Sequence, residues 1–344
     1  MPQTLDSFNR LRVALPHSIF DSKCLADKQP LVYDDQEVSG SGTSSVFNTH
    51  EASVTLAVSA NTAGMRVRQT RRRFLYQPGK STMVMFTAVL GASQAGITKR
   101  QGLFDESDGV FFQMTDSGLA VVNRSRVTGT PVDTVIPQSA WDIDRMDGTG
   151  PSGVSLDPTK AQIFLIDFQW LGTGTVRFGL IVHGEIHYVH YLQHANLLDT
   201  VYMSIPNLPL RGEISNDGTG GVGSIDMICA SVCVEGGQNN SGMPRTADRG
   251  SIELVTQNDA NVYPLVAIRL NSAYLFADIN QIFLSVLCSS SCVYRWSLVL
   301  NPSVVGDALA FGQLADSAVD YAIPTGATSL SGGTELYSGY GSSD

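Results

Sequence analysis

The 344-residue sequence is short of charge, since Asp, Glu, Lys and Arg make up 16% of it against about a quarter in an average protein. Its formal net charge is −10, which argues against nucleic acid as a partner. Long apolar runs are missing too. No stretch reaches the length of a bilayer span, and the opening MPQTLDSFNR has no apolar signal core. We therefore expect no membrane contact and folding in a cytoplasm.

Cysteine is scarce, with five residues in two spaced pairs and one single. An odd number and a cytosolic folding site favour reduced thiols. In CASVC, a continuous strand would hold Cys229 and Cys233 too far apart for a bridge, so both are predicted to be buried. In CSSSC, Cys288 and Cys292 flank a hairpin tip where a bridge is geometrically possible. The fifth cysteine is Cys24.

Long amphipathic helices are not evident, and apolar residues instead recur with period two. The clearest case is the stretch 161–192, where the runs 163–170, 176–182 and 186–192 are separated by two short turns. This alternation and the glycines in the turns predict a three-stranded antiparallel meander.

Similar short strands recur along most of the chain. Further strands are predicted at 51–58, 65–76, 80–90, 109–114, 118–123, 200–204, 211–215 and 224–234, and after the linker at 251–257, 263–270, 281–287 and 293–300. Short strands with frequent turns predict an all-β fold, a lectin-like or jelly-roll β-sandwich. The stretch TVRFGLIVHGEIHYVH resembles the hairpins of concanavalin-like sandwiches.

Composition changes divide the sequence into four parts. They are an extended N-terminal arm (1–45), the sandwich (46–235), a linker (236–250) and a smaller C-terminal β domain with a Gly/Ser-rich tail (251–344). The arm has apolar clusters without a sustained period. Its apolar residues either cover their own sandwich or pack on a neighbouring subunit. The tail would be ordered only against another surface.

Four of the six histidines are closely spaced, at His183, His187, His190 and His194. On a helix they would line one face and could hold a metal. In a hairpin, His187 and His190 would point to opposite faces. We therefore expect polar packing at these histidines and no metal.

Other reactive patterns are incomplete. The segment DIDRMDG, with Asp142, Asp144 and Asp147, is similar to a calcium loop, but an extra residue breaks the spacing and no distant Glu follows. Asx turns are the better interpretation. There is no Gly-x-Ser-x-Gly elbow and no phosphate loop. We expect no catalytic residue, no cofactor and no enzyme activity.

One basic concentration stands out in this acidic chain. It comprises Arg66, Arg68, Arg71, Arg72, Arg73 and Lys80. A solvated strand face would account for it. The alternatives are docking on an acidic neighbour and, with less support, a nucleic-acid contact.

Several motifs in order along the chain resemble a family of structural proteins of tailed bacteriophages. They are LDSFNRLRV, FDSK, DKQPLVYDD, RQTRRRFLYQPGKS, MDGTGPSGVSLD, IDFQWLGTGTVRFGL, VYMSIPNLPLR and YRWSLVLNP. The resemblance runs from the arm to about Pro302, and Asn9 stands where relatives often carry Gly. It implies a virion or tail protein of phages of aquatic bacteria, and encodes no reaction.

The resulting expectation is a non-enzymatic virion protein, made in the host cytoplasm. It would form a symmetric homo-oligomer, a trimer or a multiple of three, in tail, baseplate, fibre or capsid. Its partners would be itself, other virion proteins and a possible host surface glycan. The alternatives are a carbohydrate-binding host adhesin and a capsid decoration (cement) protein. The predicted interface residues are Phe8, Leu11, Phe20, Arg71, Arg72, Arg73, Tyr337 and Tyr340.

Overall fold

The computed structural model describes residues 5–6, 9–238, 242–250, 261–274, 276–281, 283–286, 293–324 and 328–342. The chain forms two compact units, Met1–Asn240 and Ser241–Asp344. Among the described residues, the helices are two single 3-10 turns, Gln138–Ala140 and Ser272–Tyr274, and none could cross a membrane. The predicted all-β class is confirmed.

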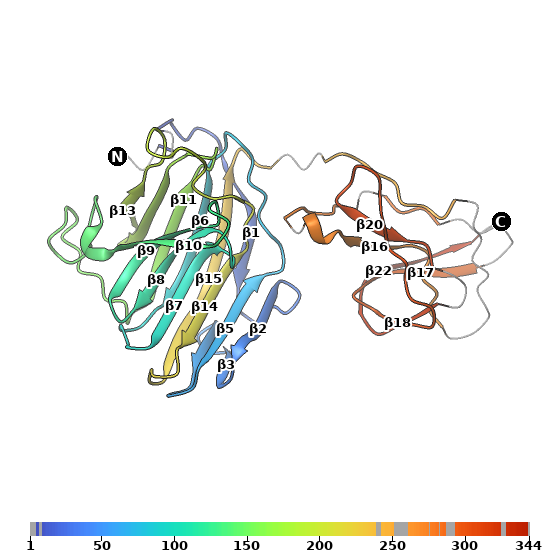
Figure 1. The fold of residues 1–344 in the computed structure, drawn as a ribbon, viewed down its shortest axis with the longest axis horizontal. Helices are drawn as coiled ribbons and strands as arrows, with labels where there is room; N and C mark the ends of the chain where they lie inside the picture. Colours follow the sequence, from blue (N-terminus) through green and yellow to red (C-terminus); the bar gives the residue numbers. More distant parts are fainter. Residues whose placement is uncertain are drawn as a thin grey trace. The chain divides into compact units, whose positions relative to one another are not determined.

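The first unit is a sandwich of two antiparallel sheets that lie face to face (Figure 1). The eight-stranded sheet has the order β13-β12-β11-β6-β15-β4-β3, with β1 also paired to β15. Its strands are β1 (Pro16–Lys23), β3 (Thr43–Asn48), β4 (Ser53–Val58), β6 (Thr82–Val89), β11 (Gln162–Phe168), β12 (Val176–Val182), β13 (Glu185–Leu192) and β15 (Gly223–Glu235).

The seven-stranded sheet has the order β10-β9-β8-β7-β14-β5-β2. Its strands are β2 (Tyr33–Gly40), β5 (Gly64–Thr70), β7 (Ile97–Phe104), β8 (Gly109–Thr115), β9 (Gly118–Ser125), β10 (Val132–Pro137) and β14 (Leu210–Asn216). The two sheets make the jelly-roll-like sandwich that the sequence predicts.

Phenylalanines from both sheets meet in the core. The Phe112 ring of β8 lies 4.7 Å from Phe164, 5.4 Å from Phe178 and 6.3 Å from Phe86, measured between ring centroids. All four side chains are fully buried. Burial of these rings, at ~25 cal/mol per Å² of apolar surface, is a main contribution to holding the sheets together.

The predicted meander is confirmed as β11-β12-β13. His183 and Gly184 both have positive φ, which a two-residue hairpin turn requires. A register shift between Phe178 and Gly179 places His190 opposite Phe178 and His187 opposite Leu180. Phe178 and Leu180 both face the core. The two histidines therefore share a face, and the expectation of opposite faces was wrong because a bulge shifts the alternation.

The expected N-terminal arm is in fact part of the sandwich. Within 1–45, β1 pairs with β15 and β2 pairs with β5. Phe20 therefore packs inside its own unit, with its ring 5.1 Å from Phe74 and 6.2 Å from Tyr33. The strand β2 (YDDQEVSG) shows no apolar alternation because it lies at a sheet edge and is largely exposed. The sandwich thus begins near Pro16 and not near residue 46.

In the described part of the second unit, the strands form three small antiparallel sheets. They are β16 (Ala267–Leu270) with β20 (Val319–Ala322) and β19 (Gly312–Gln313), β17 (Val293–Leu300) with β22 (Thr334–Ser342), and β18 (Ser303–Val305) with β21 (Ser329–Ser331). The predicted strand at 293–300 is confirmed as β17. The Gly/Ser-rich tail is not featureless, since β22 runs through it. A strand expected at 251–257, and Cys288 with Cys292, lie outside the described residues.

Removing the central ring should be costly. We predict that Phe112→Ala lowers the free energy of unfolding by about 3–5 kcal/mol, because a cavity is left among three other rings. Urea unfolding followed by tryptophan fluorescence measures this. Val132→Ala, at an exposed position of β10, is the control and should change stability by less than about 0.5 kcal/mol. Similar losses for both variants would contradict this view of the core.

Acid should weaken the sandwich through His194. Its Nδ1–H donates to the Gly174 carbonyl oxygen at 2.6 Å, and its ring stacks on Tyr202 with centroids 4.0 Å apart. Burial lowers the pKa of His194. The neutral ring is favoured in the folded state, so its contribution is complete above the unfolded pKa, about 6.5, and is lost as pH falls through the folded pKa. The melting temperature should therefore fall between pH 7 and 5, and less so in His194→Gln. Equal slopes in both proteins would exclude His194 as the cause.

Candidate functional site

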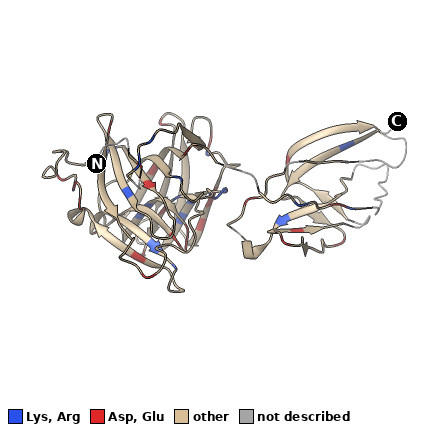
Figure 2. Cartoon of the chain, turned by 90° about the horizontal axis from the view of Figure 1, so that it is seen from above, with Lys and Arg blue, Asp and Glu red and all other residues tan. Residues whose placement is uncertain are grey.

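Outward side chains of the seven-stranded sheet form rows across its strands, because directly opposite residues share a face. One row contains Gln113, Arg100, Glu213 and Val67, from β8, β7, β14 and β5. The next contains Phe111, Gly102, Arg211 and Gln69. Figure 2 shows that basic and acidic positions both occur on the strands of this unit.

The two rows are joined by ion pairs around Glu213. Arg100 donates from Nε to Gln113 at 2.7 Å and from Nη1 to Glu213 at 2.9 Å. Arg211 donates from Nε to Glu213 at 2.8 Å and from Nη1 to Glu106 at 2.5 Å. Glu213 and Arg211 are each only 2% exposed. This network fixes the face rigidly, since a buried carboxylate between two guanidinium groups has one favourable geometry.

Guanidinium groups also cover the aromatic rings of this face. Arg124 lies 5.3 Å above the centroid of Phe111, and Arg211 lies 5.3 Å above that of Phe104. Both rings are fully buried. These contacts are cation–π interactions. The face therefore offers a ligand polar groups and no open ring for stacking.

The carboxyl groups beside this face are poor general acids. Burial would raise the pKa of Asp105, but hydrogen bonds from the Asp108 N–H and from Arg73 outweigh it and lower the pKa. The pKa of Glu106 is likewise lowered, because Arg211 outweighs burial. A general acid needs a raised pKa to hold its proton at neutral pH. Among described carboxyl groups with a shifted pKa, Glu235 alone is raised, by burial, and it pairs with Arg12.

A cavity of about 670 Å³ lies at one end of the same face. A third cross-strand row crosses it, with Thr98, Ser215 and Met65 opposite one another on β7, β14 and β5. Its full lining is Ser39, Gly40, Ala63, Gly64, Met65, Gly96, Ile97, Thr98, Thr115, Asp116, Ser215, Asn216 and Asp217. Within the described residues, the hydroxyls of Thr98 and Ser215 make no hydrogen bond. These two hydroxyls are available to a ligand.

The outer face of the eight-stranded sheet is partly covered by the segment before β1. Asp167 of β11 is fully buried, and it accepts hydrogen bonds from Arg12, Arg177 and Ser81, the last at 2.5 Å. Arg177 also donates to the Leu5 carbonyl oxygen at 2.9 Å. The N-terminal segment is thus clamped to its own sheet by charge.

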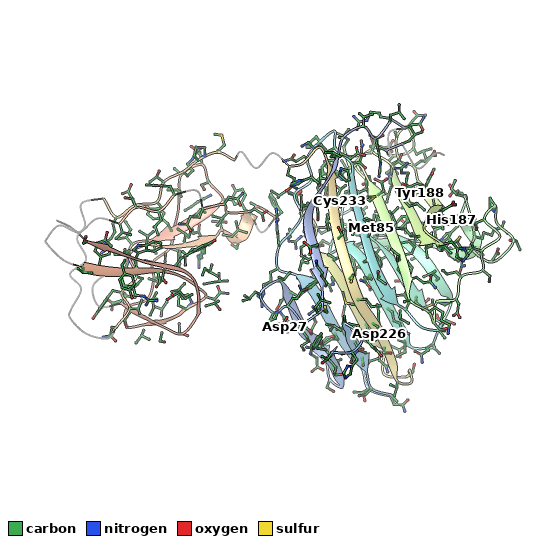
Figure 3. All side chains as sticks on the ribbon, turned by 180° about the vertical axis from the view of Figure 1, so that it is seen from behind. Asp27, Met85, His187, Tyr188, Asp226 and Cys233 are labelled. Carbon is green, nitrogen blue, oxygen red and sulfur yellow. The ribbon has the colours of Figure 1, made fainter. Side chains whose placement is uncertain are left out.

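Beside this clamp the same face is mostly apolar. Figure 3 shows Met85, Tyr188 and Cys233 spread across it, on β6, β13 and β15. Cys229 is exposed and Cys233 is half-buried, so the prediction that both are buried was wrong. A register shift between Met227 and Cys229 turns the cysteines outward and leaves Val232 and Val234 facing the core. Cys24 is buried, and none of these three thiols is in a disulfide.

The structure brings the histidine cluster and the aspartate loop together. The Asp142 carboxylate lies 2.8 Å from Nδ1 of His190. Asp144 accepts hydrogen bonds from the N–H groups of Met146 and Ser152, at 2.9 and 2.8 Å. No group of three or more metal-ligating side chains occurs within the described ranges. The contact between Asp142 and His190 attaches the aspartate loop to the edge strand β13.

Most side chains of the basic concentration contact other residues of their own chain. Arg66 pairs with Asp35 at 2.5 Å, and the Arg68 guanidinium lies 4.0 Å from the Tyr33 ring centroid and is buried. These two positions face the sandwich interior, so a solvated strand face was a wrong interpretation of them.

The predicted interface arginines also contact their own chain. Arg71 donates to the Pro30 carbonyl at 3.1 Å, Arg72 to the Ile19 carbonyl at 3.4 Å, and Arg73 to Asp105 at 2.7 Å. Of the arm residues, Phe8 lies outside the described residues, and Leu11 is 67% exposed.

Tyr337 and Tyr340 are both exposed, at 70% and 77%. They lie on the β17–β22 ribbon, where Tyr337 is opposite Leu298 and Tyr340 is opposite Arg295. Leu298 and Arg295 are three residues apart on a strand, so the tyrosines stand on opposite faces of the ribbon. Each face of the ribbon thus carries an exposed aromatic ring.

Comparison with known proteins gives no family. No family model matches the sequence, and no curated protein matches it. Among solved structures, the chain is similar to a Bacillus licheniformis beta-glucanase (8% identity, 62% of this chain and 96% of that one, TM-score 0.39). It is also similar to a Mycobacterium marinum beta-1,3-glucanase (9%, 63% and 98%, 0.41) and to a legume lectin-like domain from Entamoeba histolytica (9%, 63% and 98%, 0.35). These scores are too low to assign a family or an activity.

The sequence did not reveal the cavity residues. Thr98 lies on β7, a strand that was not predicted because Lys99 and Gln101 occupy inward positions where apolar residues are expected. Ser215 was placed on a strand, but nothing marked it as functional. The one local signal was the turn Asp217–Gly221 (DGTGG), which follows β14 and borders the cavity.

Breaking the charge clamp should destabilise the sandwich. We predict that Asp167→Ala lowers the free energy of unfolding by about 3–5 kcal/mol, because it leaves Arg177 buried without its carboxylate. Urea unfolding at pH 7 measures the loss. The control is Asp34→Ala, which removes an exposed pair with Arg71 at 3.9 Å and should cost no more than about 1 kcal/mol. Equal costs would contradict a structural role for the clamp.

Proposed function

We propose that this chain is a non-enzymatic structural protein of a tailed-phage virion that assembles as a homo-oligomer through its second unit. The supporting observation is how little of that unit is buried. Among its described residues, the buried apolar side chains are the small Ala322, Pro264 and Pro324. Phe283, Val293, Tyr337 and Tyr340 are all at least 70% exposed. A unit of this size needs a core, and association would supply the burial that its described residues lack.

Copies of the same chain are the partner that this exposure fits best. The β17–β22 ribbon carries exposed rings on both faces, so a single neighbour could cover only one of them. A closed ring of three copies places each ribbon between two others. Interfaces between subunits are enriched in aromatic residues. The sequence resemblance to phage virion proteins supports placing such an oligomer on a particle.

A second candidate function is glycan recognition by the sandwich. The observation in its favour is the polar cavity on the seven-stranded sheet, where Thr98 and Ser215 keep uncommitted hydroxyl groups. Their fixed positions on β7 and β14 suit hydrogen bonding to a hydroxyl-rich ligand. The two functions are compatible, since a particle protein can also bind the host surface.

The oligomer is tested by mass photometry of the full-length protein. We expect a trimer or a multiple of three for the wild type. Tyr337→Asp with Tyr340→Asp should weaken association at least tenfold, because burying unpaired carboxylates is costly. The matched control, Val38→Asp, changes an exposed apolar residue of β2 in the sandwich and should leave the oligomer intact.

Three outcomes would contradict the proposal. A wild-type protein that is monomeric at micromolar concentration excludes self-association through the second unit. Absence of the chain from purified particles, measured by mass spectrometry, excludes the virion role. Release of reducing ends from polysaccharides by the purified protein would contradict the non-enzymatic assignment.

A further inference from the structure

We propose that the cavity at the end of the seven-stranded sheet binds a short, uncharged oligosaccharide and excludes acidic ones. This inference rests on the second proposed function, glycan recognition. It adds the place of the site, the groups that make the contacts and the class of sugar.

The position of the cavity favours a preformed site. Its row of Thr98, Ser215 and Met65 lies on three neighbouring strands, whose hydrogen bonds fix the spacing of the side chains. Side chains on strands are held more precisely than those on loops. A ligand therefore meets groups that need little ordering on binding.

The neighbouring cross-strand row, which contains Arg100 and Glu213, makes this part of the sheet stiffer. Arg100 and Glu213, two residues from Thr98 and Ser215 on the same strands, are bonded to each other at 2.9 Å. Glu213 is also held by Arg211 at 2.8 Å. This network lies next to the row of hydroxyls, outside the cavity lining, and leaves its own groups committed.

The lining has the chemistry of a sugar site. Thr98 and Ser215 provide hydroxyls that can both donate and accept. Met65 adds an apolar surface for the C–H face of a sugar ring. The volume of about 670 Å³ lies within the range of ~300–1,000 Å³ that is usual for small-molecule sites.

The charge of the lining selects against anions. Asp116 and Asp217 both line the cavity, and no Lys or Arg belongs to the lining. Hydrogen bonds from the hydroxyl and N–H of Thr219, at 2.7 and 2.8 Å, keep the pKa of Asp217 lowered, so it is ionised. A sialylated or sulfated sugar would meet like charge, which disfavours binding. A neutral sugar can instead donate its hydroxyls to these carboxylates.

The test uses the full-length protein on an array of neutral gluco-, galacto- and manno-configured oligosaccharides with sialylated and sulfated counterparts. Hits are then titrated by calorimetry. Thr98→Val with Ser215→Ala removes both hydroxyls and keeps the shape. The matched control, Thr87→Val with Ser231→Ala, makes the same changes on β6 and β15 of the other sheet. Melting temperatures confirm that both variants are folded.

We expect wild-type and control proteins to bind neutral oligosaccharides, and the cavity variant to bind them at least about tenfold more weakly, since two hydrogen bonds are lost. Equal binding by the cavity variant would overturn this site and leave glycan recognition standing. Preferential binding of acidic sugars would overturn the neutral class. Binding of no sugar by the wild type would overturn both the inference and the function on which it rests.

Discussion

The pairing of one long strand, β15, holds the first unit together. It hydrogen-bonds to β6 along one edge, and along the other edge to β4 in its first half and β1 in its second half. Segments near the start of the chain are thereby tied to residues more than 200 positions later. Such pairings are costly to close in a flexible chain and are repaid by the apolar core between the sheets.

The two outer faces of the sandwich differ in what covers them. On the eight-stranded sheet, the segment before β1 passes over β11 and β12, where Asp167 and Arg177 hold it. On the seven-stranded sheet, arginines lie over the aromatic rings and pair with Glu213. Both faces carry a buried charged network, on the eight-stranded sheet beside a mostly apolar surface, and these charges are tolerated because each has a partner. The open cavity lies beyond the end of the arginine network, where the row of small hydroxyl side chains begins.

The second unit is packed differently from the first. Its sheets are small and its apolar side chains are mostly exposed. Domains of about 100 residues are normally stable because they bury well over half of the surface of the unfolded chain. In the described part of this unit, nearly all apolar side chains are exposed or only half-buried. Under the proposed virion role, copies of the chain held at high local concentration would supply the missing contacts.

The sequence could predict elements whose apolar residues alternate. The meander from 162 to 192, the central strand β6 and the hairpin of β8 and β9 were all found this way. Elements that break the alternation were missed. In β7 the inward positions include Lys99, whose ammonium donates to the Leu90 carbonyl oxygen at 2.6 Å inside the sandwich. In β2, which lies at an edge, most side chains face solvent. Neither strand shows the pattern of a half-buried sheet.

By itself, the sequence determined the all-β class, because period-two alternation and frequent turns are local properties. It also determined the low charge and the lack of a reactive motif. Only the tertiary structure decided that the first 45 residues belong to the sandwich, because β1 and β2 gain their partners from distant strands. Only the tertiary structure placed Thr98 beside Ser215, and Asp142 beside His190. Such neighbours depend on sheet order and register, which contacts between distant residues fix and which no local pattern encodes.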